Sequence, residues 1–407
     1  MRHRSQWNRR HFLRTVGGIG FLASIPPARL PGRTREFFPL PLEALRHYHW
    51  WVREDFQSAW GPPPTAEGLT YRLWPGANLI GTLLVQSIAG LWRNGQLLQI
   101  SVVVIDAGNW FGFGKAPTDQ EARIEQFSEE FQKASEAVTQ FLPEADRSSI
   151  EIGRGTQLQH EAEIIPSGDL WMRVTMAENQ LIKIVITPTE RDATHVLASF
   201  RETSRRQQRD YFESLPVTTD RGDVLIEGLP IFPQGDRAYC GVSTLAMAMQ
   251  HAGLRLDTED YAMAAHIRFG STENSQIRET YEAAGELADM RLKRSLRFDF
   301  DKARRSIDEG FPVLVHRRFT RQRDYLHTHF SRRWQEDSTL QLPRPDPKDQ
   351  EQWPGDEAYT HASVINGYNE ARGEIVFTES WDEQFRNRRM RAEELEATSY
   401  MAYYGGL

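Results

Sequence analysis

The only cysteine in this 407-residue chain, Cys240, stands where a helix is predicted to begin. Apolar residues recur after it at the spacing of one helix face, namely Val242, Leu245, Ala246 and Met249. A helix N-terminus carries partial positive charge and unpaired N–H groups, which favour a thiolate over a thiol and can hydrogen-bond an oxyanion. The sequence therefore predicts a nucleophilic cysteine; the alternative is a small buried apolar residue.

A histidine and a carboxylate are predicted to meet at one end of a β-hairpin. His361 opens a strand that ends in a glycine turn, and Glu379 follows the returning strand, residues 374–378. A thiol nucleophile needs a histidine to take or hold its proton and a third group to bond the other ring nitrogen. Glu379 is predicted to be that third group, with Asp382 close enough in sequence to compete. For His361 the alternative is a structural histidine at a strand end.

These residues lie in three stretches that resemble the motifs of papain-like cysteine peptidases. The stretches are Gln234 to Gly241, the run from His361 to Tyr368, and Glu379-Ser380-Trp381. The run from Cys240 to Gly253 is most similar to the bacteriocin-processing branch, whose substrates carry double-glycine leaders. The resemblance covers about residues 226–404.

The resemblance implies a role for each residue. Cys240 attacks a peptide carbonyl, and His361 acts as general base and then as general acid. Gln234 and the backbone N–H of Cys240 bind the oxyanion, while Glu379 orients His361. Glu379 departs from the Asn or Asp of the family, and its longer side chain could misplace the histidine ring. No metal or organic cofactor is needed.

The chain is predicted to be an α+β protein with three parts. Residues 1–35 are a signal segment, residues 36–225 an α+β domain of unknown role, and residues 226–407 a papain-like domain. In this last domain a helical part carries Cys240, and an antiparallel sheet carries His361. Helices are predicted at residues 42–56, 118–141, 195–212 and 300–309, and strands at residues 83–105, 170–175, 181–186, 311–315 and 374–378.

Two polar stretches of the last domain receive their own predictions. Residues 317–334 are basic, and the alternation of polar side chains around His327 and His329 indicates a solvated face rather than a metal site. Residues 342–356 are rich in proline and polar side chains. An insertion of this length before the histidine strand is predicted to form a flap over the cleft.

Residues 1–35 resemble a twin-arginine export signal, and the alternative is a disordered basic tail. Arg9 and Arg10 precede a weakly apolar, glycine-containing stretch that is too short to span a membrane stably. The whole chain carries −7, and these residues hold eight arginines and no acid, so the remainder carries −15. Such an acidic protein is a poor candidate for binding nucleic acid or anionic lipid. Because residues 1–35 resemble such a signal, export by the twin-arginine machinery to the periplasm or the extracellular space is predicted.

Together these features predict an exported thiol-dependent peptidase that hydrolyses peptide bonds in a peptide or protein substrate. No stable membrane span is expected after signal removal. Two alternatives remain on the same scaffold. One is an acyltransferase or transglutaminase, in which the same thiol passes its acyl group to an amine. The other is a catalytically inactive, peptidase-like binding protein.

Overall fold

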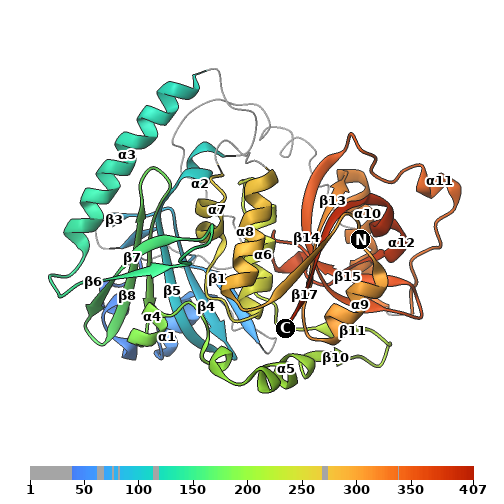
Figure 1. Ribbon diagram of the computed structural model, residues 1–407, viewed down its shortest axis with the longest axis horizontal. Helices are drawn as coiled ribbons and strands as arrows, with labels where there is room; N and C mark the ends of the chain where they lie inside the picture. Colours follow the sequence, from blue (N-terminus) through green and yellow to red (C-terminus); the bar gives the residue numbers. More distant parts are fainter. Residues whose placement is uncertain are drawn as a thin grey trace, which may run out of the picture. The chain divides into compact units, whose positions relative to one another are not determined.

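The computed structural model describes residues 39–61, 68–75, 78–80, 83–112, 119–267, 274–337 and 339–407. The predicted signal, residues 1–35, lies outside them. Residues 38–407 make up one compact unit. The predicted α+β class is confirmed, because two antiparallel sheets are combined with helices in this unit (Figure 1). The division between residues 36–225 and 226–407 stays a prediction.

The first sheet has seven antiparallel strands, and every pair of neighbours runs in opposite directions. In spatial order they are β1 (Leu69–Leu73), β4 (Ser87–Arg93), β5 (Gln96–Asp106), β9 (Leu181–Thr187), β8 (Leu170–Ala177), β7 (His160–Ser167) and β6 (Ser148–Ile152). A separate short hairpin pairs β2 (Leu79–Ile80) with β3 (Leu83–Leu84). A turn joins β4 to β5 within the stretch that is predicted to form strands, residues 83–105. It places Asn94 and Gly95 at φ 49° and 81°, as a tight two-residue hairpin requires.

The first part of the chain also contains helices and 3₁₀ turns. They are η1 (Leu42–Leu45), η2 (Tyr48–Trp50), α1 (Glu54–Ala59), α2 (Ala107–Phe111), α3 (Gln120–Phe141), α4 (Glu190–Thr194), η3 (Ser199–Glu202) and α5 (Arg205–Glu213). The helix predicted at residues 118–141 is confirmed by α3. The helix predicted at residues 42–56 is three short pieces instead, because His47 and Arg53 adopt extended backbone angles. Similarly, residues 195–212 are interrupted before η3 and α5.

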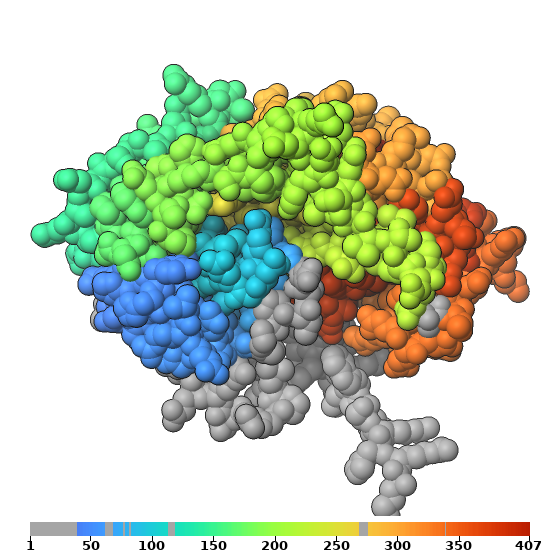
Figure 2. All heavy atoms as spheres, turned by 90° about the horizontal axis from the view of Figure 1, so that it is seen from below, coloured from blue at the N-terminus to red at the C-terminus, as the bar shows by residue number. Residues whose placement is uncertain are grey.

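The second sheet has eight strands and also pairs antiparallel throughout. Its main path is β10 (Pro216–Thr218), β11 (Val224–Ile226), β14 (Tyr359–Asn369), β13 (Val313–Phe319), β17 (Ser399–Gly406) and β12 (Arg291–Ser295). On a branch, β15 (Glu374–Thr378) pairs with β14 and with β16 (Arg388–Arg391). In Figure 2 the lime segment, which holds α5 and β10, lies over the middle of this face, with blue and green residues on one side and orange residues on the other.

The helices of this second part are α6 (Cys240–His251), α7 (Thr258–Ala264), α8 (Asn274–Leu287), α9 (Phe300–Asp308), α10 (Arg321–Glu336), α11 (Pro347–Gln350), η4 (Glu383–Phe385) and α12 (Ala392–Thr398). Every residue of α6 from Gly241 to Gln250 is buried, so the helix lies in the interior of the protein. It packs against β13 and β14 on one side and against α7 and α8 on another (Figure 1). The hydrophobic core around α6 also includes Ile152, Leu158 and Ala162 from the first sheet and its loops.

Candidate active site

Cys240 is the first residue of α6, as the sequence predicts, and its side chain is partly buried. Two hydroxyl groups bind the backbone of this first turn. Thr244 donates to the carbonyls of Cys240 and Gly241 at 2.9 and 2.8 Å, and Tyr281 donates to the carbonyl of Gly241 at 2.8 Å. His361 and the backbone N–H groups of Ala362 and Gly241 lie close enough to the thiol to lower its pKa. The helix start therefore presents a sulfur atom surrounded by donors.

The strand register brings His361 and Glu379 to one face of the second sheet. Arg317 of β13 stands directly opposite His361 of β14. The pairing of β14 with β15 ends at Val364 and Thr378, so Glu379 continues the register opposite Ser363. Because side chains two positions apart in a strand share a face, Ser363 and His361 point to the same side. The hairpin predicted from the sequence thus carries Glu379 back to His361.

Glu379 is fully buried and accepts hydrogen bonds from several donors. His361 Nε2 lies 2.7 Å from Oε2, and Arg317 donates to Oε1 at 2.9 Å. The hydroxyl of Ser363 lies 3.0 and 3.1 Å from the two oxygens, and Arg388 forms an ion pair at 3.6 Å. An ionised carboxylate can only accept, so His361 Nε2 carries the proton and Nδ1 is left for Cys240. The longer glutamate side chain reaches the ring at hydrogen-bond distance because the arginines and Ser363 hold it there.

The competing carboxylate, Asp382, is engaged elsewhere. Its Oδ1 accepts from the backbone N–H of Gln384 at 2.9 Å, and its Oδ2 accepts from the Gln384 side-chain amide at 2.8 Å. Asp382 therefore caps η4, which is a common use of aspartate at the start of a helical turn. The structure places Glu379, and not Asp382, against His361.

The electrostatics of the site favour one charge state. Burial raises the pKa of the Cys240 thiol, but the hydrogen bond and charge of His361 outweigh this effect, and the pKa lies below its usual value. Burial lowers the pKa of His361, yet the charge of Glu379 and the hydrogen bonds to Cys240 and Glu379 raise it to about 9. Both shifts favour a thiolate beside an imidazolium at neutral pH.

The carboxylate stays ionised throughout this range. Burial raises the pKa of Glu379, but the charges of His361, Arg317 and Arg388 and the hydrogen bond from His361 outweigh it. The pKa of Glu379 therefore lies well below its usual range. Glu379 is thus a permanent negative charge beside His361, and the two arginines compensate for its burial.

A second histidine, His316, lies near the same helix start. It is 8% exposed, and its Nε2 has no hydrogen-bond partner. A Cβ added at Gly241 would lie 3.7 Å from the His316 ring, which places this ring beside the first turn of α6. Burial and the charge of His361 lower the pKa of His316 to about 4. His316 is therefore neutral at pH 7, and His361 is the imidazolium.

Two aromatic rings cover His361. The ring of Trp381 lies 5.0 Å from the His361 ring between centroids, and the ring of Phe319 lies 5.4 Å away. These apolar faces exclude water from the side of the imidazole, and lower local polarity strengthens its interaction with Glu379. The tryptophan follows Glu379-Ser380 in the sequence, within the third motif.

Gln234 is tied to the residue that follows Glu379. Its backbone N–H donates to the carbonyl of Ser380 at 2.8 Å, and its Oε1 accepts from the Ser380 hydroxyl at 2.8 Å. Its Nε2 donates to the carbonyl of Arg237 at 3.2 Å. An amide nitrogen carries two N–H groups. One N–H of Gln234 is thus used within the loop, and the contacts of Oε1 fix which end of the amide carries nitrogen.

The roles of Arg317 and Arg388 were not predicted from the sequence. A buried carboxylate demands a positive partner, but the sequence does not indicate which arginines supply it. Arg317 lies in β13, which extends beyond the predicted strand of residues 311–315 into the stretch that is predicted to be a solvated face. Arg388 comes from β16, whose pairing with β15 gave no local sequence signal.

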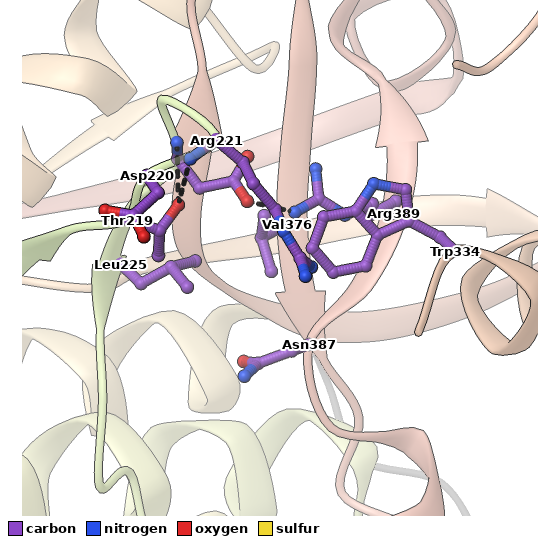
Figure 3. A pocket seen from close by; sticks show the side chains of 9 residues that line it. Thr219, Asp220, Arg221, Leu225, Trp334, Val376, Asn387 and Arg389 are labelled. Atoms are coloured by element: carbon purple, nitrogen blue, oxygen red, sulfur yellow. Dashed lines mark hydrogen bonds and ion pairs between the residues drawn. The ribbon is translucent and has the colours of Figure 1, made fainter. Parts of the chain in front are cut away.

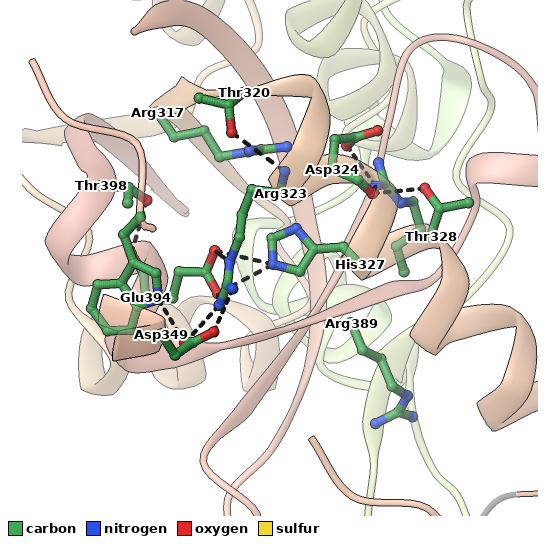
Figure 4. Close-up of polar contacts among 12 residues, drawn as sticks. Arg317, Thr320, Arg323, Asp324, His327, Thr328, Asp349, Arg389, Glu394 and Thr398 are labelled. Atoms are coloured by element: carbon green, nitrogen blue, oxygen red, sulfur yellow. Dashed lines mark hydrogen bonds and ion pairs between the residues drawn. The ribbon is translucent and has the colours of Figure 1, made fainter. Parts of the chain in front are cut away.

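The solvated-face prediction for residues 317–334 is wrong for His327. Most of this stretch is helix α10, and His327 is 3% exposed with Nε2 on Glu394 at 3.2 Å, while His329 two positions later is exposed. Arg323 binds both Glu394 and Asp349 with two nitrogens each, as Figure 4 shows. Residues two positions apart lie on different faces of a helix, so His327 faces the interior and His329 faces solvent.

Residues 342–356 also differ from the predicted flap. Their helix α11 is held to α10 by the contact of Arg323 with Asp349, and to α12 by Gln350, which donates to Glu393 at 3.1 Å. Figure 1 draws α11 at the right edge, away from α6. The excursion therefore packs on the outer helices of the second part of the chain.

A cavity of about 210 Å³ lies elsewhere on the second sheet (Figure 3). It is lined by Thr219, Asp220, Arg221, Asp223, Leu225, Trp334, Val376, Asn387 and Arg389. None of the four predicted site residues belongs to this lining. Arg389 is already paired with Asp223 at 2.5 Å and with Glu374 at 3.1 Å, so its charge is compensated within the protein.

The described residues offer neither a metal site nor a membrane-spanning helix. Among them, no group of three or more His, Cys, Asp or Glu side chains is arranged to hold a metal ion. Within the same ranges, no helix combines the length and the apolar character needed to cross a bilayer.

Comparison with known proteins concerns the second part of the chain. Residues 226–406 match the model of the Peptidase_C39 like family. The peptidase domain of Streptococcus ComA, a bifunctional ABC transporter involved in a quorum-sensing pathway, is 15% identical; the match covers 43% of this chain and 96% of that chain, with a TM-score of 0.28. A proposed C39-like peptidase from Bacillus anthracis is 14% identical over 45% of this chain and 96% of that chain, with a TM-score of 0.29. No curated protein matches the chain. The family match relates residues 226–406 to C39-like cysteine peptidases.

Proposed function

We propose that the protein is a thiol-dependent peptidase in which Cys240 is the nucleophile, His361 the general base and acid, and Glu379 the group that orients His361. The observation that carries this proposal is the placement of His361 between the Cys240 thiol, whose pKa it lowers, and the buried Glu379, whose Oε2 lies 2.7 Å from His361 Nε2. A thiol hydrolase needs a nucleophile, a base that exchanges protons with it, and a group that orients the base. Cys240, His361 and Glu379 would supply these three. The match to C39-like peptidases supports the same reaction class.

The reaction begins with the thiolate of Cys240 attacking the carbonyl carbon of a peptide bond. The carbonyl oxygen becomes an oxyanion, and collapse of this intermediate expels the amine, which takes the proton held at His361 Nδ1. A thioester then joins Cys240 to the acyl part of the substrate. Neutral His361 takes a proton from water, which attacks the thioester, and release of the acid regenerates the thiolate beside the imidazolium.

Gln234 is proposed to bind the oxyanion together with the backbone N–H of Cys240. The support comes from the Gln234 amide, which keeps one N–H outside its contact with Arg237 and is held by two contacts to Ser380. Donors that are fixed before the charge develops stabilise a transition state most effectively. Removing one such donor typically lowers kcat by about 10²–10³-fold.

The test is hydrolysis of a peptide mixture by the signal-free protein, with Cys240→Ala as the control. We expect cleavage at defined bonds by the unaltered protein, no cleavage by the alanine variant, and a mass increase on Cys240 when the acyl-enzyme is trapped by acid. A protein that transfers the acyl group to an added amine in preference to water is instead an acyltransferase. A protein that neither cleaves nor forms an adduct with any peptide refutes the proposal.

We also propose export by the twin-arginine route. The support is in the sequence alone, where Arg9 and Arg10 precede a weakly apolar stretch. Residues 1–35 fused to a folded reporter are expected to carry it out of the bacterial cytoplasm, and a fusion with Arg9→Lys and Arg10→Lys is expected to stay inside. Equal export of the two fusions contradicts this route.

A further inference from the structure

A buried carboxylate of the first sheet contacts the loop that leads into the nucleophile. Asp106 is the last residue of β5 and is 3% exposed. Its Oδ1 accepts from the hydroxyl of Tyr239 at 2.8 Å, and its Oδ2 accepts from Nη1 of Arg237 at 3.3 Å. Tyr239 immediately precedes Cys240, so their Cα atoms are about 3.8 Å apart. Holding Tyr239 therefore holds the backbone of the nucleophile.

The side chain of Arg237 donates hydrogen bonds to backbone carbonyls of the same loop. Its Nε donates to the carbonyl of Gln234 at 2.9 Å, and its Nη2 donates to the carbonyl of Pro233 at 3.2 Å. Its own carbonyl accepts from the Gln234 side-chain amide. Its Nη1 also donates to Glu259 of α7 at 2.5 Å. Arg237 thus links Asp106 and Glu259 to the amide that is proposed to bind the oxyanion.

The first sheet also fixes the helix that carries Glu259. Lys183 of β9 is 1% exposed, and its Nζ donates to Asp257 at 2.5 Å and to Asp260 at 2.7 Å at the start of α7. Removing one partner from such a buried charge cluster leaves an uncompensated charge, which costs several kcal/mol. Two strands of the first sheet therefore contribute to one connected buried cluster around the nucleophile loop.

The close approach of Tyr239 depends on a glycine in the first sheet's adjoining helix. A Cβ at Gly108 of α2 would lie 1.7 Å from the Tyr239 hydroxyl oxygen, far inside contact distance. Asp106 also accepts from the N–H of Gly108 at 3.2 Å. The start of α2 and the end of β5 therefore pack closely around the Tyr239 hydroxyl.

We propose that Asp106 is a positioning residue for the reaction at Cys240. Through Tyr239 it sets the place of the thiol relative to His361, and through Arg237 it sets the Gln234 amide. The first sheet, which lies outside the C39-like match, thereby completes the site. This inference rests on the proposed peptidase function. Displacing a reacting group by about 1 Å can lower the rate about 100-fold. Because Asp106 holds the loop at Tyr239 and at Arg237, its loss is expected to lower the rate of the reaction at Cys240.

The test compares Asp106→Asn, Tyr239→Phe and Asp192→Asn in the full signal-free chain. Asparagine keeps one acceptor for Tyr239 but turns an amide donor toward Arg237, whereas phenylalanine removes only the hydroxyl contact. Asp192 of α4 is the matched control, because it pairs with Arg255 across the same two parts of the chain without touching the nucleophile loop. The readouts are the rate of iodoacetamide alkylation of Cys240 across pH, and kcat and KM for a cleaved peptide.

For Asp106→Asn we expect alkylation at pH 6 to slow by about tenfold or more and its pH profile to move to higher pH. We expect kcat to fall by about 10–100-fold with KM changed by less than about threefold. Tyr239→Phe should act in the same direction, by about threefold, and Asp192→Asn should leave the profile and kcat within about twofold. Loss of melting temperature alone, without these changes, is what a purely structural role predicts.

A folded Asp106→Asn variant with the unaltered pH profile and kcat overturns the inference. If that variant does not fold, an unaltered profile and kcat in Tyr239→Phe overturn it equally. Different results refute the peptidase proposal and the positioning role of Asp106. An ordinary thiol titration in the unaltered protein refutes the peptidase proposal itself, whereas an activated thiol that is indifferent to Asp106 and Tyr239 refutes only the positioning role.

Discussion

Replacing Glu379 by glutamine is the most informative single change at the site. The volume of the side chain is almost unchanged, but its charge and one of its two acceptor oxygens are lost. Three donors converge on this carboxylate: His361 at 2.7 Å, Arg317 at 2.9 Å and Ser363 at 3.0 Å. An amide offers them a single oxygen and adds two donors of its own. Glu379→Gln therefore disrupts the group that holds the imidazole without opening a cavity.

The magnitude follows from the pKa of His361. It is raised from its ordinary value of 6.5 to about 9, although burial alone lowers it. Each pKa unit corresponds to about 1.4 kcal/mol, so the surroundings favour the imidazolium by about 3 kcal/mol. The charge of Glu379 is the largest contribution that raises the pKa. Its loss should shift the balance between thiolate–imidazolium and thiol–imidazole toward the neutral pair by about two orders of magnitude.

The assay is alkylation of Cys240 and peptide hydrolysis by Glu379→Gln at pH 6–7. We expect kcat/KM to fall by about 100-fold and alkylation to slow in parallel. Glu379→Asp is a second variant: it keeps the charge for the arginines but is one methylene shorter, so its loss should be smaller. Glu394→Gln is the matched control, because Glu394 is equally buried and bound to an arginine and a histidine that do not touch Cys240. A folded Glu379→Gln variant with the unaltered rates refutes the electrostatic reasoning.

Three further predictions concern the surroundings of the site. Arg317→Met leaves the buried Glu379 with less positive charge and should lower the free energy of unfolding by about 3–5 kcal/mol, as measured by denaturant titration. Burial raises the pKa of Glu394, but its hydrogen bonds to Arg323 and His327 lower it to about 2, so its stabilisation is present above pH 4.5 and is lost as pH falls toward 2. Glu394→Gln should therefore melt with a weaker pH dependence between pH 4.5 and 2, and an unchanged slope contradicts this. Ser380→Ala releases Oε1 of Gln234 and should reduce kcat by about tenfold with little change in KM; a change in KM alone contradicts its role in holding the amide.

Local patterns predicted the elements that carry the site. The apolar period after Cys240 predicted α6, and the glycine turn after His361 predicted the β14–β15 hairpin. Both are short-range features, because a helix face or a hairpin is formed by neighbouring residues. The same hairpin geometry predicts Glu379 beside His361, and the two side chains lie 2.7 Å apart in the structure.

Contacts between distant elements were not predicted. Arg388 reaches Glu379 from β16, and Asp106 reaches Tyr239 across 133 positions of sequence. Neither residue has a local pattern that marks it, since a charged side chain in a strand is ordinarily read as exposed. The helix predicted over residues 42–56 failed for a different reason. Its aromatic residues are spaced like a helix face, yet the chain turns back within this stretch, and the indole N–H of Trp51 donates to the carbonyl of Ala44, seven positions earlier, at 2.7 Å.

The central claim is that Cys240 and His361 form a thiolate–imidazolium pair. Its most direct test is the rate of iodoacetamide alkylation of Cys240 from pH 4 to 10, in the folded protein and in His361→Ala. The account predicts alkylation that is already fast in mild acid and that slows at these pH values when His361 is removed. A single titration near ~8.5, the same in both proteins, would mean an ordinary thiol and would contradict the account.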